Sequence, residues 1–197
     1  MGRGPYAKSA ARRAEILAAA RDSFAERGFA ASSLRDIAER AGTTHAVLQH
    51  HFSGKEELLI AVLAQRDADE QAAGEREVER SFGALTAYLA GVLRSHQGEP
   101  ELMRLWAELA VAASRPDHPA HAYFVERYER ARARIAGSVS DLAGTGPLDA
   151  ETATTLLHAL LNGLQVVWLL DPSLDIVTPI ERFMDLIGPD GPSPAAS

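Results

Sequence analysis

The chain has 197 residues, of which 46% are hydrophobic, and its net charge is −7. A chain of this length and hydrophobic content can bury a core and form one or two domains. It contains no cysteine, which excludes disulfides and thiolate metal sites and favours a reducing cytoplasm. We expect no signal peptide at the start MGRGPYAKSAARR and no membrane-spanning run.

The charge is distributed unevenly along the chain. Residues 1–55 carry nine Lys or Arg against five Asp or Glu, whereas residues 56–197 carry eleven against twenty-two. The first segment is therefore positive by four and the second negative by eleven, which sum to −7. A small basic domain fused to an acidic one can still attract phosphate locally, so the first segment is the candidate for nucleic acid.

Helical spacing of apolar residues and the absence of an alternating strand pattern predict an all-α fold. The first helix is expected over 9–27, with Gly28 as its stop. Gly144-Thr-Gly-Pro147 is expected to be a loop. Five later helices are predicted over 82–97, 101–114, 119–142, 150–170 and 176–187.

The stretch SSLRDIAERAGTTHAVLQHHFSGK predicts a helix-turn-helix. A short helix with regularly spaced apolar residues ends just before Gly42, a turn residue that adopts a left-handed conformation without strain. Thr43 or Thr44 can cap a second short helix that directs Leu48 inward and its other side chains outward. DNA is therefore the first partner to consider.

Ser53-Gly54-Lys55-Glu56 is typical of a capping box at the start of a fourth, long helix. Lys55 lies in its first turn, where the helix dipole disfavours a cation, so the sequence predicts a phosphate near this ammonium group. The helix is apolar as far as Leu63 and strongly polar over 66–80, which indicates a solvated connection between two domains.

The segment RRAEILAAARDSFAERGFAASSLRDIAERAGTTHAVLQHHFSGKEELLIAVL closely resembles the DNA-binding domain of TetR-family transcriptional regulators. The C-terminal part resembles BetI-like members, through Trp106 with Glu108 and through LLNGLQVVWLLDP over 160–172. The most specific matches in the first part are Ile16, Ala20, Phe24 and Gly28, then Ile37, Ala38 and Gly42, and finally His51, Phe52 and Lys55.

The resemblance implies an N-terminal three-helix helix-turn-helix DNA-binding domain followed by a C-terminal helical ligand-binding and dimerisation domain. The expected boundaries are 1–8 for a flexible basic arm, 9–55 for the DNA-binding domain, 56–187 for the helical domain and 188–197 for a disordered tail. It also implies a cytoplasmic homodimer that binds double-stranded operator DNA and a small-molecule effector of unknown identity. No cofactor, metal or membrane is expected.

The resemblance also assigns residues to DNA. Arg35 can donate to guanine O6 and N7, and Val47 can pack against a thymine methyl. Gln49 stands where the family usually has tyrosine and Ala46 where it commonly has glycine, which affects the expected affinity more than the fold. Arg35, His45, Ala46 and Val47 align with base-facing positions, Ser33, Gln49, His50 and Lys55 with phosphate-holding positions, and Thr44 completes the DNA-binding set. In the arm, Arg3, Lys8, Arg12 and Arg13 either lie over the minor groove or are disordered.

Two further sets of residues are predicted in the C-terminal part. An apolar cavity with a few polar groups needs a mixture of residue types, and the ligand candidates are Phe82, His96, Met103, Trp106, Glu108, Phe124, Tyr128 and Asn162. The apolar faces of the last two long helices can form a four-helix bundle between protomers or an intramolecular core. They consist of Leu157, Leu160, Leu161, Leu164 and Trp168, and of Ile180, Phe183, Met184 and Ile187.

No enzyme motif occurs: a P-loop, G-x-S-x-G and H-E-x-x-H are all missing. Asp117, His118 and His121 lie beside prolines at an expected helix start, which favours a cap over a metal cluster. The sequence therefore predicts a ligand-responsive homodimeric repressor that binds a near-palindromic operator and is released by its effector. Two alternatives stay open: an activator of the same fold, and a helical protein-interaction module with a vestigial helix-turn-helix, which Gln49 favours.

Overall fold

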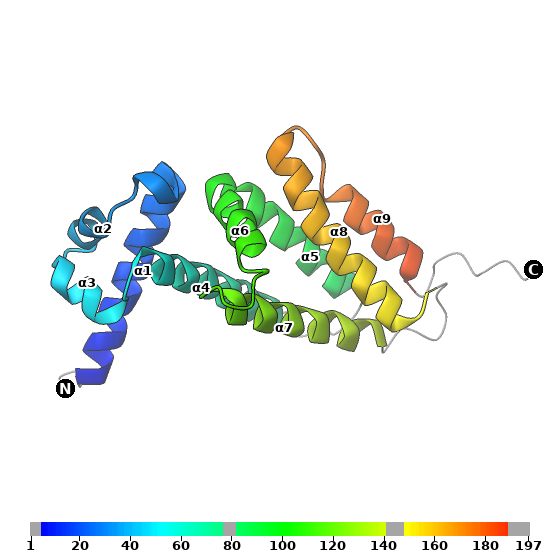
Figure 1. The fold of residues 1–197 in the computed structure, drawn as a ribbon. Coiled ribbons are helices and arrows are strands. Elements are labelled where there is room, and N and C mark those ends of the chain that lie inside the picture. Colours follow the sequence, from blue (N-terminus) through cyan, green and yellow to red (C-terminus); the bar gives the residue numbers. More distant parts are fainter. Residues whose placement is uncertain (1–4, 77–81, 141–147, 189–197) are drawn as a thin grey trace, which may run out of the picture. The chain divides into compact units, whose positions relative to one another are not determined.

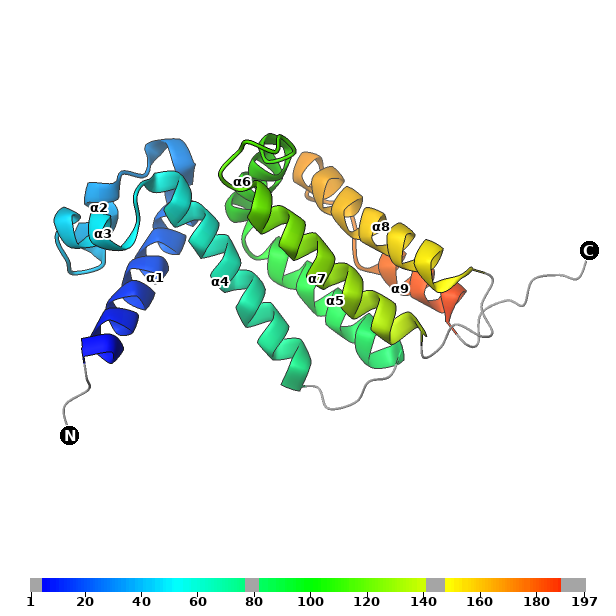
Figure 2. The ribbon, with the colours of Figure 1, turned by 60° about the horizontal axis from the view of Figure 1, so that its bottom comes forward.

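The computed structural model describes residues 5–76, 82–140 and 148–188 (Figure 1). These ranges contain helices and no strand, so the predicted all-α class is confirmed (Figure 2). The helices are α1 (Pro5–Ala31), α2 (Leu34–Arg40), α3 (His45–His51), α4 (Lys55–Arg76), α5 (Phe82–Gln97), α6 (Pro100–Ala112), α7 (His121–Ser140), α8 (Ala150–Leu170) and α9 (Thr178–Ile187).

Helices α5 and α8 have the bounds that the sequence predicts. Helix α1 begins at Pro5, so the second half of the expected flexible arm is helical, and residues 1–4 lie outside the described residues. The predicted loop at 144–147 also lies outside them, as does the predicted tail over 188–197 except for Gly188. The helix starts that differ, at Pro100, His121 and Thr178, depart from expectation by one to two residues.

The chain folds as two compact units. The first comprises Met1–Asp69 and Glu99–Tyr123, and the second comprises Glu70–Gly98 and Phe124–Ser197. The predicted domain boundary at residue 55 does not coincide with this division, because α6 packs on α1 and joins the first unit. Its inward face, which includes Leu102 and Met103, is buried.

In the first unit, an ion pair joins α1 to the residue that precedes α6. The Nε and Nη2 atoms of Arg21 both donate to Glu99 Oε1, at 2.9 and 2.6 Å. The core beneath is formed by apolar side chains of α1, among them Ile16 and Phe24, which are fully buried. The helix-turn-helix is thus built on a base that includes a segment about 80 positions further along the chain.

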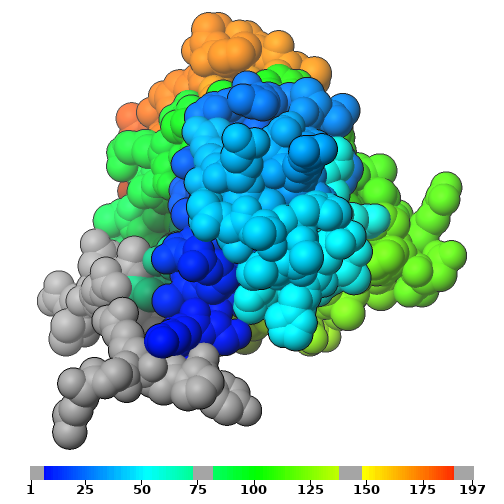
Figure 3. All heavy atoms as spheres, turned by 90° about the vertical axis from the view of Figure 1, so that its left-hand side faces the viewer, coloured from blue at the N-terminus to red at the C-terminus, as the bar shows by residue number. Residues whose placement is uncertain are grey.

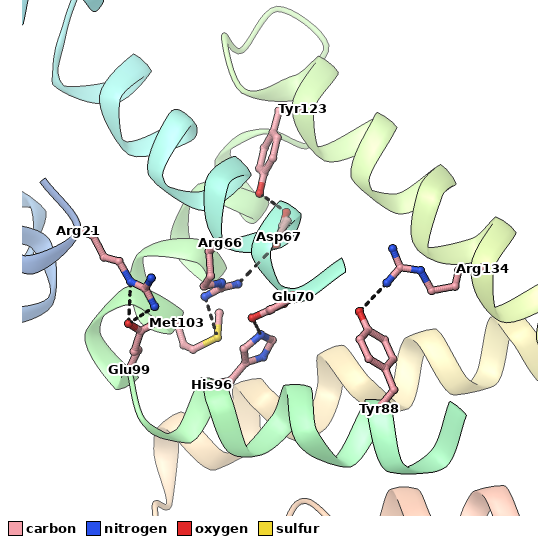
Figure 4. A network of polar contacts seen from close by, with 10 residues as sticks. All are labelled: Arg21, Arg66, Asp67, Glu70, Tyr88, His96, Glu99, Met103, Tyr123 and Arg134. Atoms are coloured by element: carbon pink, nitrogen blue, oxygen red, sulfur yellow. Dashed lines mark hydrogen bonds and ion pairs between the residues drawn. The ribbon is translucent and has the colours of Figure 1, made fainter. Parts of the chain in front are cut away.

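The predicted solvated half of α4 begins at Arg66, and for this residue the prediction is wrong. Arg66 is only 3% exposed, with Nη1 3.3 Å from Met103 Sδ and Nη2 3.8 Å from Asp67 Oδ1 (Figure 4). Asp67 in turn accepts a hydrogen bond of 2.6 Å from the Tyr123 hydroxyl. The reason is that the charged side chains of this turn meet α6 and the start of α7 instead of water.

In the second unit, α9 packs against both α5 and α8. Its apolar face, with Ile180 and Met184 fully buried, forms the core together with Leu93 and Leu157. Helix α8 begins at an Asp149 cap, whose side chain accepts from the backbone N–H of residue 152, and this hydrogen bond lowers the pKa of the carboxyl.

Helix α8 also has the length and apolar composition of a membrane span, with a mean hydropathy of 1.4 over its most apolar window. The sequence reasoning expected no such run and was wrong on this point. The reason is that its polar residues past the first turn, such as Asn162 and Gln165, are uncharged. Core and interface helices of soluble proteins share this composition, and 28% of the window is buried in the chain.

Gly28 interrupts α1, as the sequence predicts. Its φ of 72° and ψ of 173° place it in a region that is essentially restricted to glycine. The Ser32 hydroxyl lies 2.8 Å from the Gly28 carbonyl oxygen and 3.0 Å from the Ser23 carbonyl oxygen. This buried contact fixes the direction in which the chain leaves α1 for α2.

Gly28→Ala should therefore lower the free energy of unfolding by about 1 to 3 kcal/mol, because alanine cannot adopt this conformation without strain. The measurement is thermal and urea unfolding followed by circular dichroism. Gly91→Ala is the matched control, since Gly91 is an exposed position inside α5 with open space at its Cβ. The Gly91→Ala substitution should raise the free energy of unfolding by about 0.5 to 1 kcal/mol. Equal effects of the two substitutions would contradict the role of Gly28.

Candidate DNA-binding site

The two short helices of the predicted helix-turn-helix begin at side-chain caps. Ser33 Oγ accepts from the N–H of Asp36 at 3.1 Å, and Thr44 Oγ1 accepts from the N–H of Val47 at 3.3 Å. Between them Gly42 has a φ of 61°, as expected for the left-handed turn. Because each cap uses its oxygen as an acceptor, both hydroxyl hydrogens remain available to a phosphate.

Helix α3 is anchored from beneath by apolar side chains. Leu48 is fully buried and Phe52 is 2% exposed. The guanidinium of Arg13 lies 5.1 Å from the centroid of the Phe52 ring, a cation–π contact between α1 and the end of α3. Arg12 reaches toward the same region and lies 3.5 Å from the Ala41 carbonyl oxygen. The sequence reasoning placed both arginines in the arm and missed this supporting role.

An ion pair holds α2 against α1. Both terminal nitrogens of Arg40 donate to the Glu26 carboxylate, at 2.5 and 2.7 Å. This bidentate contact lowers the pKa of Glu26 and raises that of Arg40. Arg35, on the same helix, is exposed and makes no hydrogen bond or ion pair with the described part of the chain. The helix therefore has one arginine committed to the fold and one available for a partner.

The remaining residues assigned to DNA form one exposed face. Figure 3 shows the side of the first unit on which α2 and α3 lie, in light blue and cyan. Val47 is 38% exposed, so this apolar side chain is accessible to a partner. The other exposed members on these helices are Arg35, His45, Ala46, Gln49 and His50.

Lys55 is directed into the protein. Its Nζ donates to the carbonyl oxygens of Phe29 at 2.7 Å and Ser32 at 3.0 Å, and it lies 3.5 Å from that of Ala30. The same Nζ is 4.3 Å from the centroid of the Phe29 ring. The sequence predicts only a phosphate contact, and this structural role was missed. Two close carbonyls occupy two hydrogens of the ammonium group, which leaves the third weakly engaged.

The cap at the start of α4 also differs from the predicted one. Ser53 donates through its N–H and its hydroxyl to Glu57 Oε2, at 2.7 and 2.5 Å. The expected partner was Glu56, one residue earlier. The two hydrogen bonds lower the pKa of Glu57. Because Glu57 is held there, Glu56 is directed to His118, with 3.2 Å between its carboxylate and the imidazole Nε2.

The histidines that could suggest a metal cluster have protein partners. His118 Nδ1 accepts from the N–H of Ala120 at 3.1 Å, and His121 Nδ1 lies 2.8 Å from the Ala113 carbonyl oxygen. In the described ranges no group of His, Asp or Glu is arranged to hold a metal ion.

The eight ligand candidates are divided between the two units. In the first unit Met103 and Trp106 are buried core residues, whereas Glu108 is exposed. Glu108 therefore does not bear the free-energy cost of a buried carboxylate. In the second unit His96 is buried, with Nε2 3.0 Å from Glu70 Oε1 (Figure 4). The other four, half-buried or partly exposed, are Phe82, Phe124, Tyr128 and Asn162.

The residues predicted for a dimer interface are also divided. Those buried within the chain itself, and thus part of its own core, are Leu157, Trp168, Ile180, Met184 and Ile187, whereas Leu160, Leu161, Leu164 and Phe183 are half-buried. A different stripe of α8 is exposed and was not singled out from the sequence, since this helix is apolar on more than one face. It comprises Leu156, Ala159, Gly163, Val166, Val167 and Leu170.

Comparison with known proteins covers both parts of the chain. The family model described as bacterial regulatory proteins, tetR family, matches residues 16–62. The model described as BetI-type transcriptional repressor, C-terminal, matches residues 83–182. A transcriptional regulator from Rhodococcus sp. Rha1 has the same fold, with a TM-score of 0.73 and 27% identity over 89% of this chain and 95% of that one.

Two curated relatives are similar to the chain over different lengths. The transcriptional regulator TtgR of Pseudomonas putida is 28% identical over 184 residues, which cover 88% of each chain. The transcriptional activator FasR of Mycolicibacterium smegmatis is 44% identical over 70 residues, which cover 36% of this chain and 32% of FasR. The chain belongs to the TetR family, whose members are DNA-binding transcription factors and not enzymes.

Proposed function

We propose that this protein is a ligand-responsive, homodimeric transcriptional regulator that represses its targets by binding a near-palindromic operator. The observation that carries the proposal is the exposed α2–α3 face, on which Arg35, His45 and Val47 lie beside two capped helix starts. The local net charge of residues 1–55, positive by four, favours the approach of this face to DNA.

The contacts follow from the chemistry of the exposed side chains. Arg35, His45, Ala46 and Val47 are proposed to meet base edges, where a guanidinium suits guanine and an apolar group suits a thymine methyl. The residues proposed to hold phosphates are Ser33, Thr44, Gln49, His50 and Lys55. An amide at Gln49 can donate to a phosphate oxygen in the place of the tyrosine that is usual in the family.

A homodimer supplies the second half of the operator contact. The exposed stripe of α8 defined above is apolar and has small residues, Ala159 and Gly163, at its centre, which permit close approach of a second helix. Leu186 of α9 is also an exposed apolar side chain, at 45%. A self-complementary apolar patch favours a twofold dimer, and such a dimer reads two half-sites about one helical turn apart.

Regulators of this family bind small-molecule effectors. We infer that an effector binds in the second unit and shifts the equilibrium away from the DNA-competent spacing. The protein is proposed to act in the cytoplasm, where its operator lies. A second candidate function, activation, is favoured by one observation: FasR, which is 44% identical over 70 residues, is named a transcriptional activator.

The experiment that tests the proposal is selection of bound sequences from a random duplex pool, followed by fluorescence titration at fixed salt. A pseudo-palindromic sequence, bound at one dimer per site, is the expected result. If no sequence is enriched, the proposal of a DNA-binding regulator is refuted. The alternative of a protein-interaction module would then be favoured. Reporter transcription with the operator placed over the promoter then distinguishes repression from activation.

Arg35→Ala should weaken operator binding by about 1 to 3 kcal/mol and relax the preference at one base pair, because the guanidinium is free to donate to a base. The matched control is Arg40→Ala, which removes the same charge from α2 although its guanidinium is committed to Glu26. Titrations against the selected operator and its single-base variants measure both effects. The same loss of base preference in both variants would contradict the assignment.

Lys55→Ala should have two effects, because the ammonium group holds the end of α1 and keeps one hydrogen for a phosphate. The free energy of unfolding should fall by about 1.5 to 3 kcal/mol, as two carbonyls lose a charged donor. The slope of log affinity against log salt should fall by about one. Arg27→Ala, an exposed charge of α1, serves as control. A lower stability with an unchanged slope would remove Lys55 from the phosphate contacts.

Val167→Glu should dissociate the dimer. Val167 is 48% exposed on α8. Dimerisation would bury the introduced glutamate, with its charge beside the same glutamate of the partner. The dissociation constant should rise at least about a hundredfold, which sedimentation velocity measures. Val111→Glu is the control, since Val111 is 75% exposed on α6 and lies outside the proposed interface. If Val167→Glu stayed dimeric, the interface would have to lie elsewhere.

A further inference from the structure

Helix α3, on the face that Figure 3 shows, has no side chain with a permanent charge. Its seven residues include no Lys, Arg, Asp or Glu, but three of the chain's seven histidines: His45, His50 and His51. Imidazole is the side chain whose charge changes between about pH 5 and 8. Any positive charge that the side chains of α3 present to a partner therefore depends on pH.

The rest of the exposed α2–α3 face adds no net positive charge. Helix α2 holds two arginines and two acidic residues, so its formal charge is zero. One of these arginines, Arg40, is bound to Glu26 of α1. Lys55, the lysine nearest to α3 along the chain, is engaged with two backbone carbonyls. The excess of four positive charges in residues 1–55 consequently lies outside α2 and α3.

His50 is the imidazole of α3 that can accept a proton most readily. It is exposed in the last turn of the helix, where the helix dipole favours a cation. His45 is also exposed, but it is the first residue of the helix, where the dipole disfavours a cation. The two imidazoles thus occupy opposite ends of one short helix, and the end that holds His50 suits a positive charge.

His51 is less suited to a charge, although it is adjacent. It is half-buried, and its ring centroid is 5.5 Å from that of His50 and 6.4 Å from that of Phe52. The Phe52 ring already carries the guanidinium of Arg13, at 5.1 Å. A proton on His51 would therefore be placed between a permanent cation and a second imidazole, where like charges disfavour it.

Charged groups on the elements around α3 leave His50 unpaired within the described part of the chain. The charged side chains that these elements contribute are Arg12 and Arg13 of α1, Arg35, Asp36, Glu39 and Arg40 of α2, and Lys55, Glu56 and Glu57 of α4. No hydrogen bond or ion pair joins any of them to His50 in the described ranges. Glu57, one turn further along the chain, is held by Ser53. An anion that stabilises protonated His50 therefore has to come from a partner.

We propose that DNA binding is coupled to the uptake of a proton at His50, so that the affinity for DNA rises as the pH falls from about 8 to 6. A DNA phosphate beside the imidazole favours the protonated form, which then donates a charge-assisted hydrogen bond to a phosphate oxygen. The neutral ring makes the same contact more weakly at high pH. This inference rests on the proposed function, because it describes the regulation of that DNA-binding face.

The test is fluorescence titration of the full-length protein with the selected operator at constant ionic strength. The wild type should bind about tenfold more tightly at about pH 6 than at about pH 8, since each protomer of the dimer adds a charge-assisted contact. The slope of log affinity against log salt should be steeper at the lower pH by about one to two. A non-operator duplex of the same length should show the same trend, because a phosphate contact carries no sequence information. Circular dichroism at each pH controls for unfolding.

Two substitutions assign the effect to His50. His50→Gln keeps a neutral hydrogen-bond donor and should make the affinity nearly independent of pH, at the level of the wild type at about pH 8. His50→Lys keeps a positive charge throughout and should retain the tighter binding at about pH 8 as well. His45→Gln is the matched control on the same helix, and it should leave the pH dependence unchanged.

Calorimetry counts the proton directly. Binding enthalpies are measured at about pH 7 in two buffers of different ionisation enthalpy, and their difference gives the number of protons taken up. The wild type should take up protons when it binds the operator, and His50→Gln should not. This measurement is independent of any uniform change in affinity that a substitution causes.

Three results would overturn the inference: equal affinity of the wild type at both pH values, no proton uptake on binding, or an undiminished pH dependence in His50→Gln. A loss of the pH dependence in His45→Gln would do so as well, because the proton would then be bound at the other end of α3. A protein that binds its operator equally well at both pH values fails only here. One that binds duplex DNA without sequence preference, yet with the expected pH dependence, fails as a regulator and not here.

Discussion

The ammonium group of Lys55 closes the helix-turn-helix. The chain leaves α1 at its end, forms α2 and α3, and returns at the start of α4, where Lys55 Nζ donates to the carbonyls of Phe29 and Ser32. One side chain thus joins the two ends of a segment of 26 positions. These carbonyls lie in the last turn of α1 and in the link that follows it, and Lys55 gives both of them a charged donor. The position of the exposed α2–α3 face relative to α1 depends on this closure, on the Arg40–Glu26 pair and on the stacking of Arg13 on Phe52.

The same unit includes more of the chain than a DNA-binding domain requires. Arg21 holds Glu99 before α6, and Glu56 meets His118 in the segment between α6 and α7. Both contacts attach later parts of the sequence to the helices that support α2 and α3. The chain crosses between the two units three times, within α4, between α5 and α6, and within α7.

The sequence predicts what local interactions decide. Gly28, Gly42 and the Thr44 cap act within a few residues, and the structure places each as expected. Predictions that depend on long-range packing were less successful. Arg66 is read as solvated from its polar neighbours, yet it is buried because of α6. Similarly, the faces of α8 cannot be told apart by hydrophobicity, since Leu157 turns inward and Leu156 outward although the residues are identical in type and adjacent.

The candidate sites also consist of parts that local interactions decide and parts that depend on long-range packing. The exposed side of α3 was predictable because a capped helix of seven residues buries one face, and Leu48 shows which face is inside. The polar atoms of the second unit were not, since a lone histidine and a lone glutamine in apolar helices have many satisfactory environments. Only the three-dimensional arrangement shows that the Thr154 hydroxyl donates to a carbonyl while Gln165 Oε1 has no hydrogen-bond partner among the described residues.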